Sequence, residues 1–200
     1  MTIRAIDNTA ALQANLLSGD VDMVPSGIGL FTEQAVALQK QQGSRFRFIF
    51  KPQLICETII AQTRNPALQN ERVRKALLMA VDVKAIVDRL LGGHGEIART
   101  FVSSLDRHYT PDVPTYGYDP ARARALLDQA GWTPGPDGIR RNAAGTRLTL
   151  EFTTTAGNRS RELTQLVMQS QWKAAGVDVT VRNQPPRTFF GQTLTHREFS

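Results

Sequence analysis

Short apolar segments that favour strands alternate with amphipathic helical segments along most of this chain. The strand candidates among the first fifty residues cover 2–6, 21–24 and 46–50, and the helix candidates cover 10–17 and 32–43. Phe46, Phe48 and Phe50 stand at every second position, which is the period of a strand with one apolar face. Alternating strands and helices pack as βαβ units, so the pattern predicts an α/β fold with a mixed sheet flanked by helices.

Capping residues mark the helix starts in the rest of the chain. Asn70 and Asp82 each precede a helical pattern, and Asp119 is followed by Pro120, whose missing N–H costs nothing at the first helical position. The remaining predicted elements are a strand at 54–62, a long loop at 95–118, a hairpin at 139–155, a helix at 160–175, a strand at 177–181 and a helix at 188–195. These elements extend the α/β pattern over the whole chain.

Neither the apolar content nor the N-terminal residues indicate membrane insertion or export. The longest uninterrupted apolar stretch, 76–81, is far shorter than the roughly 20 residues of a membrane-spanning helix. Residues 1–5 lack the basic and apolar regions of a signal peptide. We therefore expect either a cytoplasmic protein or a piece of a longer exported one, and we expect no membrane span in these residues.

The positive charge invites a nucleic-acid interpretation. The chain has 24 Lys and Arg residues against 18 Asp and Glu residues, a net charge of +6. Its longest basic cluster is short, 72–75, and no segment interleaves basic residues with aromatic residues that could stack on bases. We expect no nucleic-acid partner, and an Arg-rich nucleic-acid-binding domain remains the alternative from a different class of protein.

Motifs for catalysis, cofactors and metals are missing from the sequence. It contains no phosphate-binding glycine loop and no nucleophile elbow. His94, His108 and His196 are not spaced as ligands on one helix face, and Cys56 is predicted to be a buried, inert thiol. We therefore expect no catalytic residue, no cofactor and no metal site.

Four sequence blocks follow one another in a distinctive order along the chain. They are Leu17-Ser18-Gly19-Asp20-Val21-Asp22, then residues 70–77 with Ala80-Val81-Asp82, then residues 118–139 with Tyr118-Asp119-Pro120 and Ala130-Gly131-Trp132, and finally residues 171–179. In this order and spacing, the blocks resemble extracellular solute-binding proteins, specifically the large family that serves peptide, nickel and opine ABC importers. The resemblance extends over nearly the whole chain.

The resemblance implies a fold and a division into domains. Proteins of this family have a two-lobed periplasmic-binding-protein fold of the class II type, which closes on its ligand. By resemblance, residues 1–55 are the returning part of the first lobe, with a βαβα pattern and a further strand. Residues 56–200 are most of the second lobe, cut short at the C-terminal end. The sequence is then expected to be an internal fragment, so that the export signal and any lipid anchor lie outside it.

The resemblance also implies a function and a binding loop. It implies the substrate-binding component of an ABC importer. Outside the cytoplasm, this component captures a peptide or similar small solute, and it delivers the solute to the membrane permease, which works with an ATPase. The pocket residues of the second lobe then include Thr154, Thr155, Asn158 and Arg159, and Arg159 can hold a ligand carboxylate bidentately. A nickel, haem or opine carrier of the same family is the alternative, with His94 and His108 as the only handles for a metal.

Overall fold

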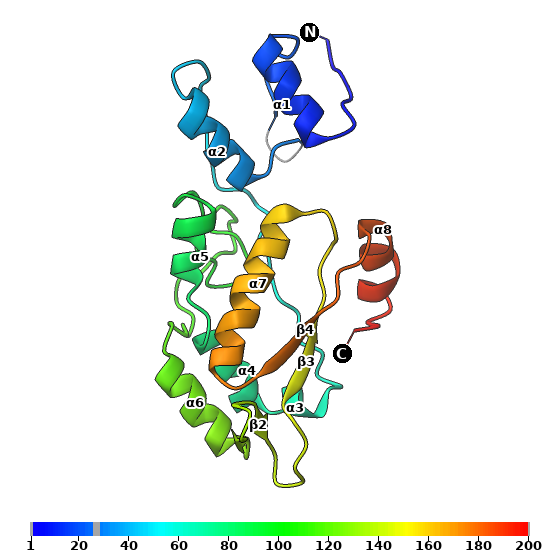
Figure 1. Ribbon diagram of the computed structural model, residues 1–200. Coiled ribbons are helices and arrows are strands. Elements are labelled where there is room, and N and C mark those ends of the chain that lie inside the picture. The colour runs from blue at the N-terminus through cyan, green and yellow to red at the C-terminus, as the bar shows by residue number, and fades with distance from the viewer. Residues whose placement is uncertain (1, 26–28, 200) are drawn as a thin grey trace. The chain divides into compact units, whose positions relative to one another are not determined.

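The computed structural model describes residues 2–25 and 29–199, which form two compact units, Met1–Phe50 and Lys51–Ser200 (Figure 1). In the first unit, α1 (Thr9–Ser18) and α2 (Thr32–Gln42) confirm both predicted helices. The Asn8 side chain caps α1 by accepting a hydrogen bond of 2.8 Å from the N–H of Ala11. Gly19 ends α1 at a φ of 91°, a left-handed conformation that glycine adopts without strain.

The strands predicted at 2–6, 21–24, 46–50 and 54–62 are not formed among the described residues. The alternation of apolar side chains marks the two faces of an extended segment. A strand also needs a neighbour that pairs with its backbone N–H and C=O groups, and side-chain periodicity carries no information on that neighbour. The βαβα pattern expected for the first fifty residues is therefore wrong in its strands, and its two helices are formed.

The second unit contains the remaining elements. They are α3 (Pro66–Gln69), α4 (Glu71–Met79), α5 (Val83–Leu90), α6 (Pro120–Gln129), β1 (Thr133–Pro134), β2 (Arg140–Arg141), β3 (Thr149–Phe152), α7 (Arg159–Ala174), β4 (Asp178–Val181), α8 (Pro186–Thr188) and a π-helical turn, Phe189–Leu194. The predicted caps are confirmed, because the side chains of Asn70, Asp82 and Asp119 accept hydrogen bonds of 2.9, 2.9 and 2.8 Å from first-turn N–H groups of α4, α5 and α6.

The βαβ unit of this chain is β3, α7 and β4. The two strands pair in parallel, with Leu150 opposite Val179, and α7 makes the crossover between them. Of the hairpin predicted at 139–155, an isolated antiparallel bridge between Arg141 and Arg147 is formed, and the N–H of Leu148 donates to the carbonyl of Arg140 at 2.8 Å. The strand β2 pairs with β1 instead. The parallel and antiparallel pairs lie in separate two-stranded sheets.

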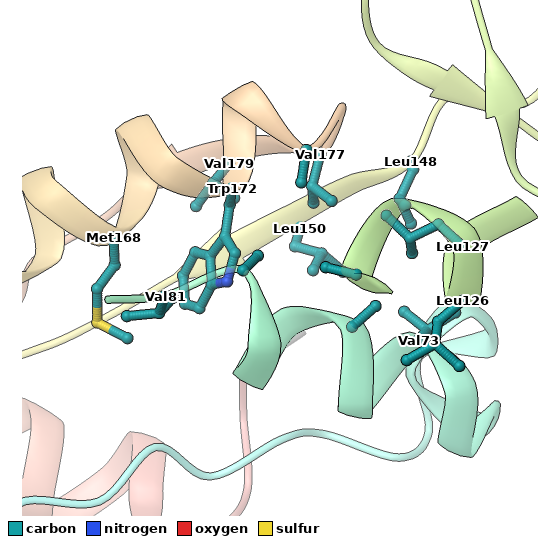
Figure 2. Packing of buried hydrophobic residues seen from close by; sticks show 14 of the residues in the cluster. Val73, Val81, Leu126, Leu127, Leu148, Leu150, Met168, Trp172, Val177 and Val179 are labelled. Atoms are coloured by element: carbon teal, nitrogen blue, oxygen red, sulfur yellow. The ribbon is translucent and has the colours of Figure 1, made fainter. Parts of the chain in front are cut away.

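The core of the second unit lies between α7, the β3–β4 pair, α4 and α6 (Figure 2). Trp172 of α7 lies in this core: its indole N–H donates to the carbonyl of Leu77 at 2.9 Å, and its ring meets the Phe152 ring edge-on at 5.3 Å between centroids. The buried cluster consists of Leu68, Val73, Ala76, Ala80, Val81, Ile86, Ala123, Leu126, Leu127, Trp132, Leu148, Leu150, Met168, Trp172, Ala175, Val177 and Val179. This packing fixes α7 against the sheet.

One buried arginine joins three elements at the C-terminal end of α7. Arg140 is 3% exposed, and its guanidinium donates to the carbonyls of Ala175 and Trp132 at 2.9 and 2.6 Å and to the Asp128 carboxylate at 2.5 Å. Its stem packs over Gly176, where a Cβ atom would lie 2.7 Å from the Arg140 Cγ.

No helix among the described residues is both long enough and apolar enough to span a bilayer.

Candidate functional site

The carboxyl ends of β3 and β4 lie at one edge of the parallel pair. Both strands point toward the end at which the chain leaves for α7 and α8 (Figure 1). The segments that follow them, 153–158 and 182–185, therefore meet at this edge, and open parallel sheets bind ligands outside the carboxyl ends of their strands. An isolated parallel bridge between Thr155 and Gln184 holds the two segments together.

Thr154 and Thr155 lie in the first of these segments. The N–H of Thr154 donates to the Asn183 side chain at 3.3 Å, and its carbonyl accepts from the N–H of Gln184 at 3.0 Å. Thr155 is 2% exposed, and its hydroxyl accepts a hydrogen bond of 3.0 Å from Nη1 of Arg161. The hydroxyl of Thr155 therefore serves the protein itself, by holding an arginine at the edge.

Asn158 and Arg159 lie at the start of α7. The Asn158 side chain caps the helix by accepting from the N–H of Arg161 at 3.1 Å. Gly157, at a φ of 83°, makes the turn before it and donates its N–H to the Glu162 carboxylate at 2.9 Å. The Arg159 side chain is exposed and has no hydrogen bond or ion pair within residues 2–25 and 29–199. The structure thus places all four predicted residues along one short segment.

Arg161, two residues after Arg159, is the arginine that this segment organises, and the sequence did not single it out. Its Nε lies 3.1 Å from both carboxylate oxygens of Glu57, and its Nη2 lies 2.7 Å from Glu57 Oε1. Its Cζ lies 5.9 Å from the centre of the Phe190 ring, within the range of a cation–π contact. The guanidinium is thus held by a hydroxyl on one side and by a carboxylate on its Nε and Nη2 side.

The partners of Arg161 come from segments far apart in the sequence. Glu57 belongs to the extended segment after Lys51, and Phe190 belongs to the π-helical turn after α8. The turn is attached to the edge because the Thr193 hydroxyl donates to the Gln184 side chain at 2.6 Å. A fixed guanidinium with a planar fork of donors can bind a carboxylate in two parallel hydrogen bonds, so this edge is chemically suited to an anionic group.

The histidines and the cysteine do not assemble into a metal site. Among the described residues, no group of three or more His, Cys, Asp and Glu side chains is placed to hold a metal ion. His108 is exposed, and its Nδ1 lies 2.9 Å from the carboxylate of Asp106. Cys56, predicted to be buried, is only partly so, because its extended segment has no strand beside it, and its Sγ lies 3.4 Å from the carbonyl of Phe101. His94 lies in the loop after α5.

Comparison with known proteins identifies the family. Residues 1–200, the entire chain, match the family described as bacterial extracellular solute-binding proteins, family 5 Middle. The chain belongs to this family. The α/β periplasmic-binding-protein fold expected for this family 5 chain is confirmed by similarity to solved structures of such proteins.

The names of the relatives of this family 5 chain state different ligands. It is 30% identical to the oligopeptide-binding protein AppA of Bacillus subtilis, over 90% of this chain and 32% of that protein. It is 26% identical to the nickel-binding periplasmic protein of Escherichia coli, over 96% of this chain and 36% of that protein. The structure of Bacillus subtilis AppA in complex with a nonapeptide matches with a TM-score of 0.73 and 26% identity, over 93% of this chain and 36% of that one. The chain thus spans about a third of these relatives.

Proposed function

We propose that this family 5 chain is part of the substrate-binding component of an ABC importer. In this proposal, residues 1–55 belong to the first lobe and residues 56–200 to the second, and a small solute is captured between them and delivered to the membrane permease and its ATPase. The observation that carries the proposal is the match of the entire chain to the solute-binding family, together with a polar edge at the carboxyl ends of β3 and β4. The protein acts outside the cytoplasm and performs no covalent chemistry.

The proposed ligand is a peptide or similar small solute, contacted by Thr154, Thr155, Asn158 and Arg159. Two features support this site. The segment leaves the parallel pair at its carboxyl end, and Arg159 is an exposed guanidinium without a partner in the described residues. The relative with the AppA name is an oligopeptide-binding protein, which supports the peptide class. Arg159 holds a ligand carboxylate in this proposal, and the threonines shape the wall beside it.

A nickel or haem carrier is the second candidate, because a nickel-binding periplasmic protein is among the relatives. This candidate requires coordinating groups at the site, and His94 and His108 are the side chains that the sequence offers. Substitution of His94 by Ala, followed by a metal-binding assay, tests the part of that histidine. A loss of nickel affinity supports the metal carrier, and unchanged affinity removes His94 from it.

Titration calorimetry tests the proposal directly. A protein of full family length that carries these 200 residues is titrated with peptide pools, opines and nickel chelates. Binding of a peptide pool that is weakened by Arg159→Ala supports the proposal, and Arg72→Ala on the far α4 helix is a matched control that should leave binding unchanged. A protein that binds none of the three classes contradicts the transport function. The 200 residues alone should bind weakly, because ligand contacts from the remaining protein are missing.

A further inference from the structure

The environment of Arg161 differs from that of an ordinary surface arginine. Its side chain is 28% exposed, and three kinds of partner surround it: the Thr155 hydroxyl, the Phe190 ring and the Glu57 carboxylate. Two of these partners belong to the edge itself, because Thr155 follows β3 and Phe190 follows β4. They hold the guanidinium in place whether or not a carboxylate is bound to it.

The third partner is attached far less firmly. The side chain of Glu57 is 71% exposed, and its segment forms no strand with the rest of the described chain. The contacts that tie this segment down near Glu57 include a hydrogen bond of 2.9 Å from the Ser103 hydroxyl to the carbonyl of Gln53 and the contact of 3.4 Å from Cys56 Sγ to Phe101. Ile55, two residues before Glu57, is 80% exposed. The Glu57 side chain can therefore rotate into solvent without opening the core.

The bonds that Glu57 makes are those that a carboxylate ligand makes. Nε and Nη2 of Arg161 form a side of the guanidinium fork that can donate two hydrogen bonds to one carboxylate, and both nitrogens donate to Glu57. The third nitrogen, Nη1, lies on the other side of the fork and donates one of its two N–H groups to Thr155. A ligand carboxylate binds the Nε and Nη2 side of this fork only when Glu57 leaves it.

We infer that Glu57 is an internal competitor, which occupies Arg161 when no ligand is bound and is displaced by a carboxylate of the ligand. The inference rests on the proposed solute-binding function, and it names the ligand class as one that carries a carboxylate. Competition raises the apparent dissociation constant, which equals the intrinsic dissociation constant divided by the fraction of molecules in which Arg161 is free. Because exposed ion pairs are weak, the factor is modest, about twofold to fivefold. Ligands without a carboxylate gain nothing from displacing Glu57 and are disfavoured at this edge.

The test follows the Nε–H signal of Arg161 in the NMR spectrum of the 200-residue protein. The signal is assigned by its loss in Arg161→Lys, which keeps the charge and removes the fork. The probe is N-acetylglycine, with N-acetylglycine amide as its neutral match, at constant ionic strength. In Glu57→Gln, the dissociation constant of N-acetylglycine should fall by about twofold to fivefold, while the amide should not bind. Glu71→Gln removes the same charge on the distant helix α4 and should leave the dissociation constant unchanged.

Equal dissociation constants in the natural protein and in Glu57→Gln overturn the competition, and so does a signal that N-acetylglycine does not move in either protein. A fall of the same size in Glu71→Gln also overturns it, because net charge alone then accounts for the effect. The competition and the transport function fail separately. If the full-length protein binds peptides while Glu57→Gln has no effect, the competitor is refuted and the function stands. If N-acetylglycine competes as expected while no solute class binds, the function is refuted and the competitor stands.

Discussion

Replacement of the buried Arg140 by Met is expected to destabilise the second unit strongly. The Met side chain keeps most of the packing volume of the arginine stem but removes its donors from the carbonyls of Ala175 and Trp132, which lie 2.9 and 2.6 Å away. A buried acceptor that loses its partner costs about 1–3 kcal/mol, so two carbonyls cost about 2–6 kcal/mol. Relief from burying the guanidinium lowers this figure, and we expect a loss of about 2–4 kcal/mol.

The ion pair with Asp128 should contribute little to this loss. The Asp128 side chain is 53% exposed and becomes hydrated when the arginine is removed, although the side chain of Arg140 is only 4% exposed. Asp128→Asn keeps a side-chain oxygen that can accept from the guanidinium and leaves both carbonyl contacts in place, so it should cost less than Arg140→Met. The comparison of the two variants separates the carbonyl contacts from the charge pair.

Urea unfolding followed by tryptophan fluorescence measures both variants. The two tryptophans of the chain, Trp132 and Trp172, lie in the second unit and in its core, so the fluorescence reports on this unit alone. Arg141→Met is the matched control, because its side chain is 35% exposed and its loss should cost less than about 1 kcal/mol. If Asp128→Asn is as destabilising as Arg140→Met, or if Arg140→Met costs no more than the control, the assignment to the two carbonyls is refuted.

Three further predictions concern the core and the surface of the same unit. Trp172→Phe removes the 2.9 Å hydrogen bond to the Leu77 carbonyl and leaves a cavity, so the free energy of unfolding in urea should fall by about 2–4 kcal/mol. Gly176→Ala places a Cβ against the buried arginine stem at a φ of 91°, and its melting temperature should fall, whereas alanine at the open Gly117 should leave it nearly unchanged. The hydrogen bond from Lys75 lowers the pKa of Glu71, so the stabilisation from this pair should disappear as the pH falls through that lowered pKa. An NMR titration should show the Glu71 pKa rising toward its ordinary value in Lys75→Met.

The parts of the fold that sequence predicts well are those fixed by neighbouring residues. Asn70, Asp82 and Asp119 each cap a helix through a hydrogen bond to an N–H group two or three residues later, so a few residues suffice to locate the helix. The extended segments behaved differently. Phe46, Phe48 and Phe50 alternate as a strand would, yet they form no strand among the described residues, because pairing depends on a second segment that their own pattern does not specify.

The candidate site divides in the same way. The segment from Thr154 to Arg159 was found because it lies between a strand and a helix, a relation that is local in the sequence. The sequence favoured Arg159 over Arg161, and nothing local separates them. Two helical positions that are two residues apart differ by about 200° around the axis, so the two side chains leave the helix on different sides and have different neighbours. The structure shows which is engaged, because the partner of Arg161 is Glu57, 104 residues away.

Arg140 and Arg161 lie at opposite ends of α7. The stability prediction for Arg140 and the binding prediction for Arg161 are therefore independent. Arg140 contacts the carbonyl of Ala175, just after the helix ends, while Arg161 lies in its first turn. The 16 residues of α7 extend over about 24 Å, and a rigid helix of this length separates the two groups by more than two Debye lengths at physiological ionic strength. The charge of Arg140 is thus screened from Arg161. The folded fraction of Arg140→Met should therefore bind N-acetylglycine with the dissociation constant of the natural protein, even though the variant unfolds at lower urea concentration.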